Sequence, residues 1–178
     1  MAISRPLARA SGIVSWLSAA GVVLVPLGTV FEFLFPEWAR TLGINVDQHG
    51  LSHLSSNVPL PDRLLACGCA MIPAAIATFG LVALTRLLRL YSRGNVFGRD
   101  AVRALGQITA ALFWNVVAAF VMEAPITYFL TRHNPPAELQ LTIQSTDIEI
   151  LFLAAVALVI SRVMTEARRL ADENAGFV

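Results

Sequence analysis

Residues 64–84 read LLACGCAMIPAAIATFGLVAL and contain no charged side chain. A run of about 18 or more apolar residues is long enough to cross the hydrocarbon core of a bilayer as a helix. Arg63 precedes this run and Arg86 follows it, so charges flank it on both sides. The helical pattern continues past the run, and residues 64–90 are therefore predicted to form a membrane span.

The same pattern recurs three more times along the chain. Residues 12–35, 104–130 and 148–164 are the other predicted spans, the first of them a signal anchor. Only 14% of the residues are charged, whereas a soluble domain carries about 25%. We therefore expect an all-α membrane protein, a single four-helix antiparallel transmembrane bundle, with a cytoplasmic helical tail over residues 165–178.

The arginines indicate the orientation of the bundle, because loops on the cytoplasmic side carry an excess of basic residues. All thirteen basic residues are arginine. With a cytoplasmic N-terminus, the other side of the membrane holds only Arg40, Arg63 and Arg132. The remaining ten then lie in the cytoplasm. This distribution predicts a multi-pass protein of the bacterial cytoplasmic (inner) membrane with both termini in the cytoplasm.

Three polar residues within the predicted spans are candidates for function: Glu123, Asn115 and Glu32. An ionisable residue inside a span is costly and points to a functional site by default. Glu123 lies about two helical turns from its span end, where it can carry protons or bind a cation. The favoured interpretation is a carboxyl that is neutral, or one that is hydrogen-bonded to Asn115 or to a neighbouring helix. Glu32 lies near the end of its span, which favours simple exposure at the interface.

Histidines and a carboxylate in the predicted outer loops form the weak candidates for a metal site: Asp47, His49, His53 and His133. On a helix, His49 and His53 would share a face and can hold zinc. A complete set of three or four ligands is not evident nearby, so solvated histidines are the favoured interpretation. We predict no metal and no cofactor.

Enzyme motifs are lacking in the sequence. There is no phosphate-binding glycine loop, no H-E-x-x-H and no G-x-S-x-G. Cys67 and Cys69 lie two apart within one predicted helix and are expected to be packing residues. The net charge of +1 gives no basic field for nucleic acid. We therefore expect neither an enzyme nor direct nucleic-acid binding, and the lipid bilayer is the predicted partner.

Small residues recur at helical spacing in the third predicted span. Ala104, Ala111 and Ala118 are seven residues apart, and such stripes allow helix backbones to approach closely in lipid. The alanines are predicted to face other helices, while Phe113 and Phe120 are predicted to face lipid.

Two cytoplasmic stretches are more distinctive. Residues 87–106 read LLRLYSRGNVFGRDAVRALG, and residues 167–174 read ARRLADEN. They resemble the inner loop and the acidic-asparagine tail of a bacterial four-span membrane family catalogued as a domain of unknown function, number twenty-nine seventy-five. The chain departs from that pattern at Gly98, where the family often has Thr or Ser, and at Ala101, which replaces an asparagine.

This resemblance implies a function on the cytoplasmic face. Members of the family are often encoded beside a small helix-turn-helix protein, which implies a regulatory partnership with a transcription factor. The inner loop would supply the partner-binding surface: Arg93, Gly94, Val96, Phe97, Arg99 and Arg103. The alternative is a small transporter or ligand sensor that uses Glu123 and Asn115. Four spans are few for a monomeric transporter, so this alternative would require a homodimer.

Overall fold

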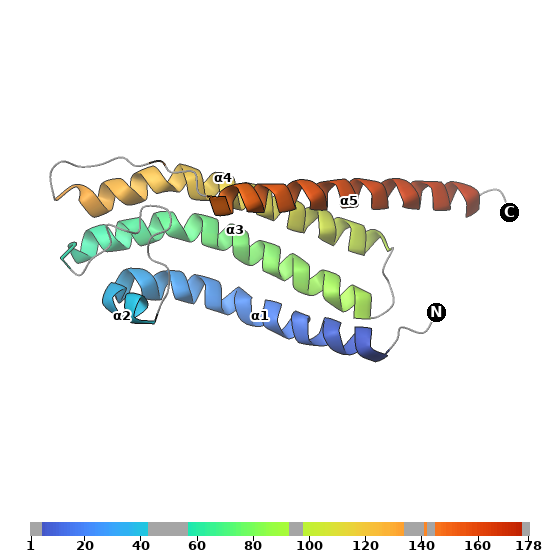
Figure 1. The fold of residues 1–178 in the computed structure, drawn as a ribbon, viewed down its shortest axis with the longest axis horizontal. Helices are drawn as coiled ribbons and strands as arrows, with labels where there is room; N and C mark the ends of the chain where they lie inside the picture. Colours follow the sequence, from blue (N-terminus) through green and yellow to red (C-terminus); the bar gives the residue numbers. More distant parts are fainter. Residues whose placement is uncertain (1–4, 43–56, 93–97, 134–140, 142–144, 176–178) are drawn as a thin grey trace.

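Helices make up nearly all of the described chain in the computed structural model (Figure 1). The structure describes residues 5–42, 57–92, 98–133, 141 and 145–175, and none of these residues forms a strand. The helices are α1 (Arg5–Leu34), α2 (Pro36–Thr41), α3 (Leu60–Ser92), α4 (Arg99–Thr131) and α5 (Ser145–Ala175).

Four of these helices are long and apolar enough to cross a membrane. The apolar segments are Val14–Leu34, Leu60–Ser92, Arg99–Thr131 and Ser145–Ala167. At about 1.5 Å rise per residue, the 33 residues of α3 span about 50 Å, whereas the hydrocarbon core is about 30 Å thick. α3 and α4 are thus long enough for their ends to reach both membrane–water interfaces. The prediction of an all-α four-helix membrane bundle is confirmed.

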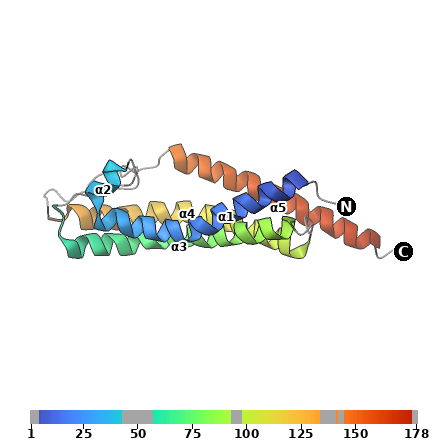
Figure 2. The same ribbon diagram turned by 90° about the horizontal axis from the view of Figure 1, so that it is seen from below.

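Each long helix packs against its neighbour in the sequence. α1 packs on α3, α3 on α4, and α4 on α5; in the described residues the backbone of α1 does not closely approach that of α4 or α5. Figures 1 and 2 show α3 antiparallel to α1 and to α4. The start of α3, the end of α4 and α2 form one end, which we call the α2 end. The start of α1, the end of α3, the start of α4 and the end of α5 form the termini end, and α5 projects beyond it (Figure 1).

Small side chains bring α3 and α4 close together. A Cβ atom added at Gly80 would lie 3.0 Å from the Cβ of Ala111. Ala104 and Ala111 are buried, and Ala118 is half-buried. Two members of the alanine stripe therefore face other helices. The large side chains of Phe113 and Phe120 are 48% and 37% exposed, as expected for residues that face lipid.

A hydrophobic cluster occupies each end of the bundle. At the α2 end, Phe33 of α1, Ala66 of α3 and Ile126 of α4 belong to one buried cluster that joins three helices. At the termini end, Leu87 of α3 packs with Ala101 and Ala104 of α4. The α3–α4 pair therefore shares buried apolar contacts near both of its ends, and among the residues whose burial is described α1 contributes to the cluster at the α2 end.

Hydroxyl groups in the helices are satisfied locally. Thr85 and Thr109 each donate to the carbonyl four residues earlier, at 2.9 and 3.0 Å, and Thr127 and Thr131 do the same at 2.9 and 2.8 Å. This bond satisfies a hydroxyl that has no water nearby. These hydroxyl protons are engaged by the helix backbone.

Candidate functional site

A buried carboxylate at the α2 end is the centre of a polar cluster that joins two helices. Asp62 lies in the first turn of α3, and its side chain is only 1% exposed. Pro61 precedes it, at a position where a helix does not need a backbone N–H donor. The positive end of the helix dipole also favours a carboxylate there. The local sequence thus places a negative charge at the start of α3.

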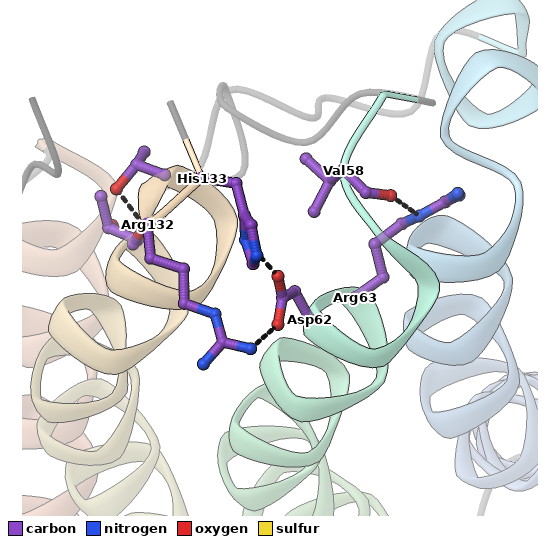
Figure 3. Close-up of polar contacts among 7 residues, drawn as sticks. Val58, Asp62, Arg63, Arg132 and His133 are labelled. Carbon is purple, nitrogen blue, oxygen red and sulfur yellow. Dashed lines mark hydrogen bonds and ion pairs between the residues drawn. The ribbon is translucent and has the colours of Figure 1, made fainter. Parts of the chain in front are cut away.

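Two residues at the end of α4 reach this carboxylate (Figure 3). The Arg132 guanidinium donates a hydrogen bond from Nη2 to Asp62 Oδ1. The Nδ1 atom of His133 lies 2.7 Å from Asp62 Oδ2. The Arg132 guanidinium also lies 5.6 Å from the centre of the Phe129 ring, within the range of a cation–π contact. We call Asp62, Arg132 and His133 the Asp62 cluster.

The two oxygens of Asp62 have different surroundings. Oδ1 accepts the charged hydrogen bond from Arg132, whereas buried Oδ2 accepts no hydrogen bond of acceptable geometry. The 2.7 Å contact between His133 Nδ1 and this oxygen is therefore electrostatic. It is attractive when the imidazole carries a second proton. The side chains of Arg132 and His133 are 35% and 56% exposed. The cluster joins α3 to α4 and remains open to water on one side.

The described residues supply no metal site. No group of three His, Cys, Asp or Glu side chains that could hold a metal ion occurs among them. His133, one of the weak metal candidates, lies against Asp62. The other three candidates, Asp47, His49 and His53, lie outside the described residues.

The polar residues within the spans take three different positions. The side chain of Glu123 is 1% exposed and lies in the buried face of α4. Asn115 donates from Nδ2 to the backbone carbonyl of Pro73 on α3, at 2.8 Å. Glu32 is half-buried near the end of α1. Asn115 thus ties α4 to α3, and part of its hydrogen-bonding capacity is already used.

Two residues of the predicted partner-binding surface lie in the described chain. Arg99 and Arg103 are exposed in the first turns of α4. Gly98 precedes the helix in an extended conformation, and its carbonyl accepts the backbone N–H of Ala101 at 3.0 Å. The helix therefore starts without a side-chain cap at Gly98. Four further residues of that surface, Arg93, Gly94, Val96 and Phe97, lie outside the described residues.

Sequence reasoning did not single out Asp62 and Arg132 as site residues. A signal for them was present, because Asp62 flanks the start of one span and Arg132 flanks the end of the next. Antiparallel neighbours bring these two positions to the same end of a bundle. What the sequence lacks is the rotation of each helix, which turns Asp62 toward α4.

Comparison with known proteins identifies the family. A family model described as "Protein of unknown function (DUF2975)" matches residues 19–176. No curated protein and no solved structure shows significant similarity to the chain. The match extends from within α1 through α3 and α4 to the end of α5, so it covers all four long helices. This chain belongs to the DUF2975 family of proteins of unknown function.

Proposed function

We propose that the protein is a multi-pass component of the bacterial cytoplasmic membrane that binds a small helix-turn-helix transcription regulator at its termini end. In this proposal the termini end faces the cytoplasm. The arginine distribution supports this orientation: Arg86, Arg89, Arg99 and Arg103 flank the spans at the termini end, and cytoplasmic flanks are the basic ones.

Labelling of single cysteines tests the orientation. Cys67 and Cys69 are first replaced by alanine, and a cysteine is then introduced at Asn57 or at Ser92, which are exposed at opposite ends of the bundle. An impermeant maleimide should label the Asn57 position in intact cells, whereas the Ser92 position should react only after lysis. Labelling in the reverse order would overturn the orientation.

The observation that carries the binding proposal is the shape of the termini end. α5 projects beyond the other helices there (Figure 1), and it packs only on α4 in the described chain. Arg99 and Arg103 are exposed beside the start of α4. A projecting helix next to exposed basic side chains offers a partner both a surface and a charge. The choice of a helix-turn-helix partner rests on the family resemblance.

Affinity capture from detergent tests the partnership. The chain is co-expressed with the helix-turn-helix protein encoded beside it, and capture of one should recover the other. Changing Arg99 and Arg103 together to glutamine should reduce recovery. The remaining cytoplasmic arginines should preserve the topology of this variant. Glu149→Gln, which removes an exposed charge near the start of α5, is the control. Absence of capture with normal expression of both proteins would overturn the proposal.

Glu123 supports the second candidate, a small transporter or ligand sensor. A carboxyl group that is 1% exposed on a membrane-spanning helix carries a cost that often reflects function. Proteoliposomes with an internal pH-sensitive dye test this candidate. Wild-type protein should dissipate an imposed proton gradient, and Glu123→Gln should abolish that flux. Equal rates for wild type, Glu123→Gln and empty liposomes would eliminate proton transport. A working transporter with four spans would also be expected to purify as a homodimer.

A further inference from the structure

A groove of about 430 Å³ opens between α1 and α3 at the termini end. Its lining combines small apolar side chains, which we call its floor, with two arginines of α3. The residues that matter for the argument are Ala19 and Val22 of α1, and Val82, Arg86, Arg89 and Leu90 of α3.

The depth of the two arginines follows from the length of α3. Residues 64–85 carry no charge, and they span about 33 Å at the rise of an α-helix. This length matches the hydrocarbon core, which is about 30 Å thick. Arg86 therefore lies at the edge of the hydrocarbon core, and Arg89 lies about one turn further out. Both guanidinium groups are at the level of lipid headgroups, and they share a helix face because they are three residues apart.

The described residues that line this groove include no acidic side chain. The only acidic residues of α1 and α3 are Glu32 and Asp62, and both lie at the α2 end. Within the described chain, Arg86 and Arg89 have no ion-pair partner. This differs from Arg132, which is paired with Asp62. An anion from outside the protein would complete the site.

We propose that the groove binds one anionic phospholipid of the surrounding leaflet. The phosphate accepts hydrogen bonds from Arg86 and Arg89, since guanidinium groups match phosphate oxygens in geometry and charge. One acyl chain lies on the floor formed by Ala19, Val22 and Val82. The lipid thereby fills the groove between α1 and α3. This site requires no partner protein and goes beyond the proposed function.

Native mass spectrometry of the full chain in mixed micelles tests the proposal. Phosphatidylglycerol is titrated in one series and phosphatidylcholine in another, and the apparent Kd of the first bound lipid is measured. Wild-type protein should bind phosphatidylglycerol more tightly. Changing Arg86 and Arg89 together to glutamine should weaken that binding about 30-fold, which corresponds to about 2 kcal/mol for two arginines near a headgroup.

A matched control separates the groove from the general basic charge of this end. Arg162→Gln combined with Arg169→Gln removes the same charge from exposed positions on α5, which does not contact α1 or α3 in the described chain. This control should bind phosphatidylglycerol as wild type does. If it weakens binding as much as the groove variant, the preference is a property of the whole basic face and the proposal fails.

The apolar floor is tested by a second pair of variants. Ala19→Phe fills the floor and leaves both arginines in place, so it should also weaken phosphatidylglycerol binding. Ala20→Phe adds the same ring at the adjacent exposed position and should have no effect. Inorganic phosphate should not compete, because it lacks an acyl chain. Effective competition by phosphate, or equal binding by both phenylalanine variants, would overturn the assignment to a lipid.

Discussion

The two ends of the α3–α4 pair differ in whether their charged side chains are paired. At the α2 end, the carboxylate of Asp62 is buried and is held by Arg132 and His133 from the other helix. At the termini end, Arg86 and Arg89 line a groove and have no ion-pair partner in the described chain. Charges at the first end join helices. At the second end, Arg86 and Arg89 are the charges that we propose to bind lipid.

This difference predicts that stability depends strongly on the first set of charges and weakly on the second. The largest effect is expected for Arg132→Ala, because it leaves the buried carboxylate of Asp62 without its charged hydrogen bond. Loss of one partner of a buried ion pair costs about 3 kcal/mol or more. The free energy of unfolding is measured by SDS titration followed by far-UV circular dichroism. As a control, Arg103→Ala removes an exposed arginine of the termini end and should change stability by less than about 0.5 kcal/mol. Equal losses in the two variants would remove the distinction between the ends.

Close packing between the two ends is tested by Gly80→Leu. A Cβ atom there would already lie 3.0 Å from the Cβ of Ala111, so a leucine must push α3 and α4 apart. Overpacking of this kind costs about 2 kcal/mol. The matched control is Gly68→Leu on the same helix, where an added Cβ has no neighbour within 4 Å. A tolerated leucine at position 80 would show that the α3–α4 contact is loose.

His133→Ala sharpens the description of the Asp62 cluster itself. His133 is 56% exposed and contacts the oxygen of Asp62 that Arg132 does not bond. Exposed charge pairs contribute about 0.5 kcal/mol, so this variant should be several times less destabilised than Arg132→Ala in the same titration. A loss as large as that of Arg132→Ala would make the histidine the principal partner of Asp62.

The smallest effect is expected for the double change of Arg86 and Arg89 to glutamine. Neither arginine has an ion-pair partner in the described chain, so the free energy of unfolding in lipid-free detergent should change by less than about 0.5 kcal/mol. This result would also show that any loss of lipid binding by the same variant is not a loss of fold. A large destabilisation would mean that these arginines stabilise the contact between helices, as the Asp62 cluster does at the α2 end.

Much of the architecture was predictable because each span is a local property. A run such as residues 64–84 partitions into lipid by the sum of its own side chains, whatever its neighbours are. The backbone of such a run must then form hydrogen bonds within its own helix, since the bilayer core offers no water to unpaired backbone groups. The alanine spacing also indicated which face of α4 packs, and Ala104 and Ala111 are buried accordingly.

The candidate site was less predictable because its contacts cross long sequence distances. Glu123 was predicted as a candidate from its charge within a span, and its side chain is buried. No sequence pattern indicated that Asn115 donates a hydrogen bond to the carbonyl of Pro73. Asp62 and Arg132 are 70 residues apart. Each residue alone looks like a charge at a span end.

The sequence by itself determined that the chain has four helices long and apolar enough to cross a membrane, and it sufficed to identify the family. Hydropathy and similarity to a family are properties of the amino-acid sequence, and they do not depend on contacts between helices. Only the tertiary structure decided which charges are paired and which are not. Pairing depends on the rotation and depth of each helix against its neighbour, as where Asp62 turns toward Arg132 and Arg86 toward the groove beside α1. These relations are set by side-chain packing between helices, which in lipid depends on where small residues allow backbones to approach.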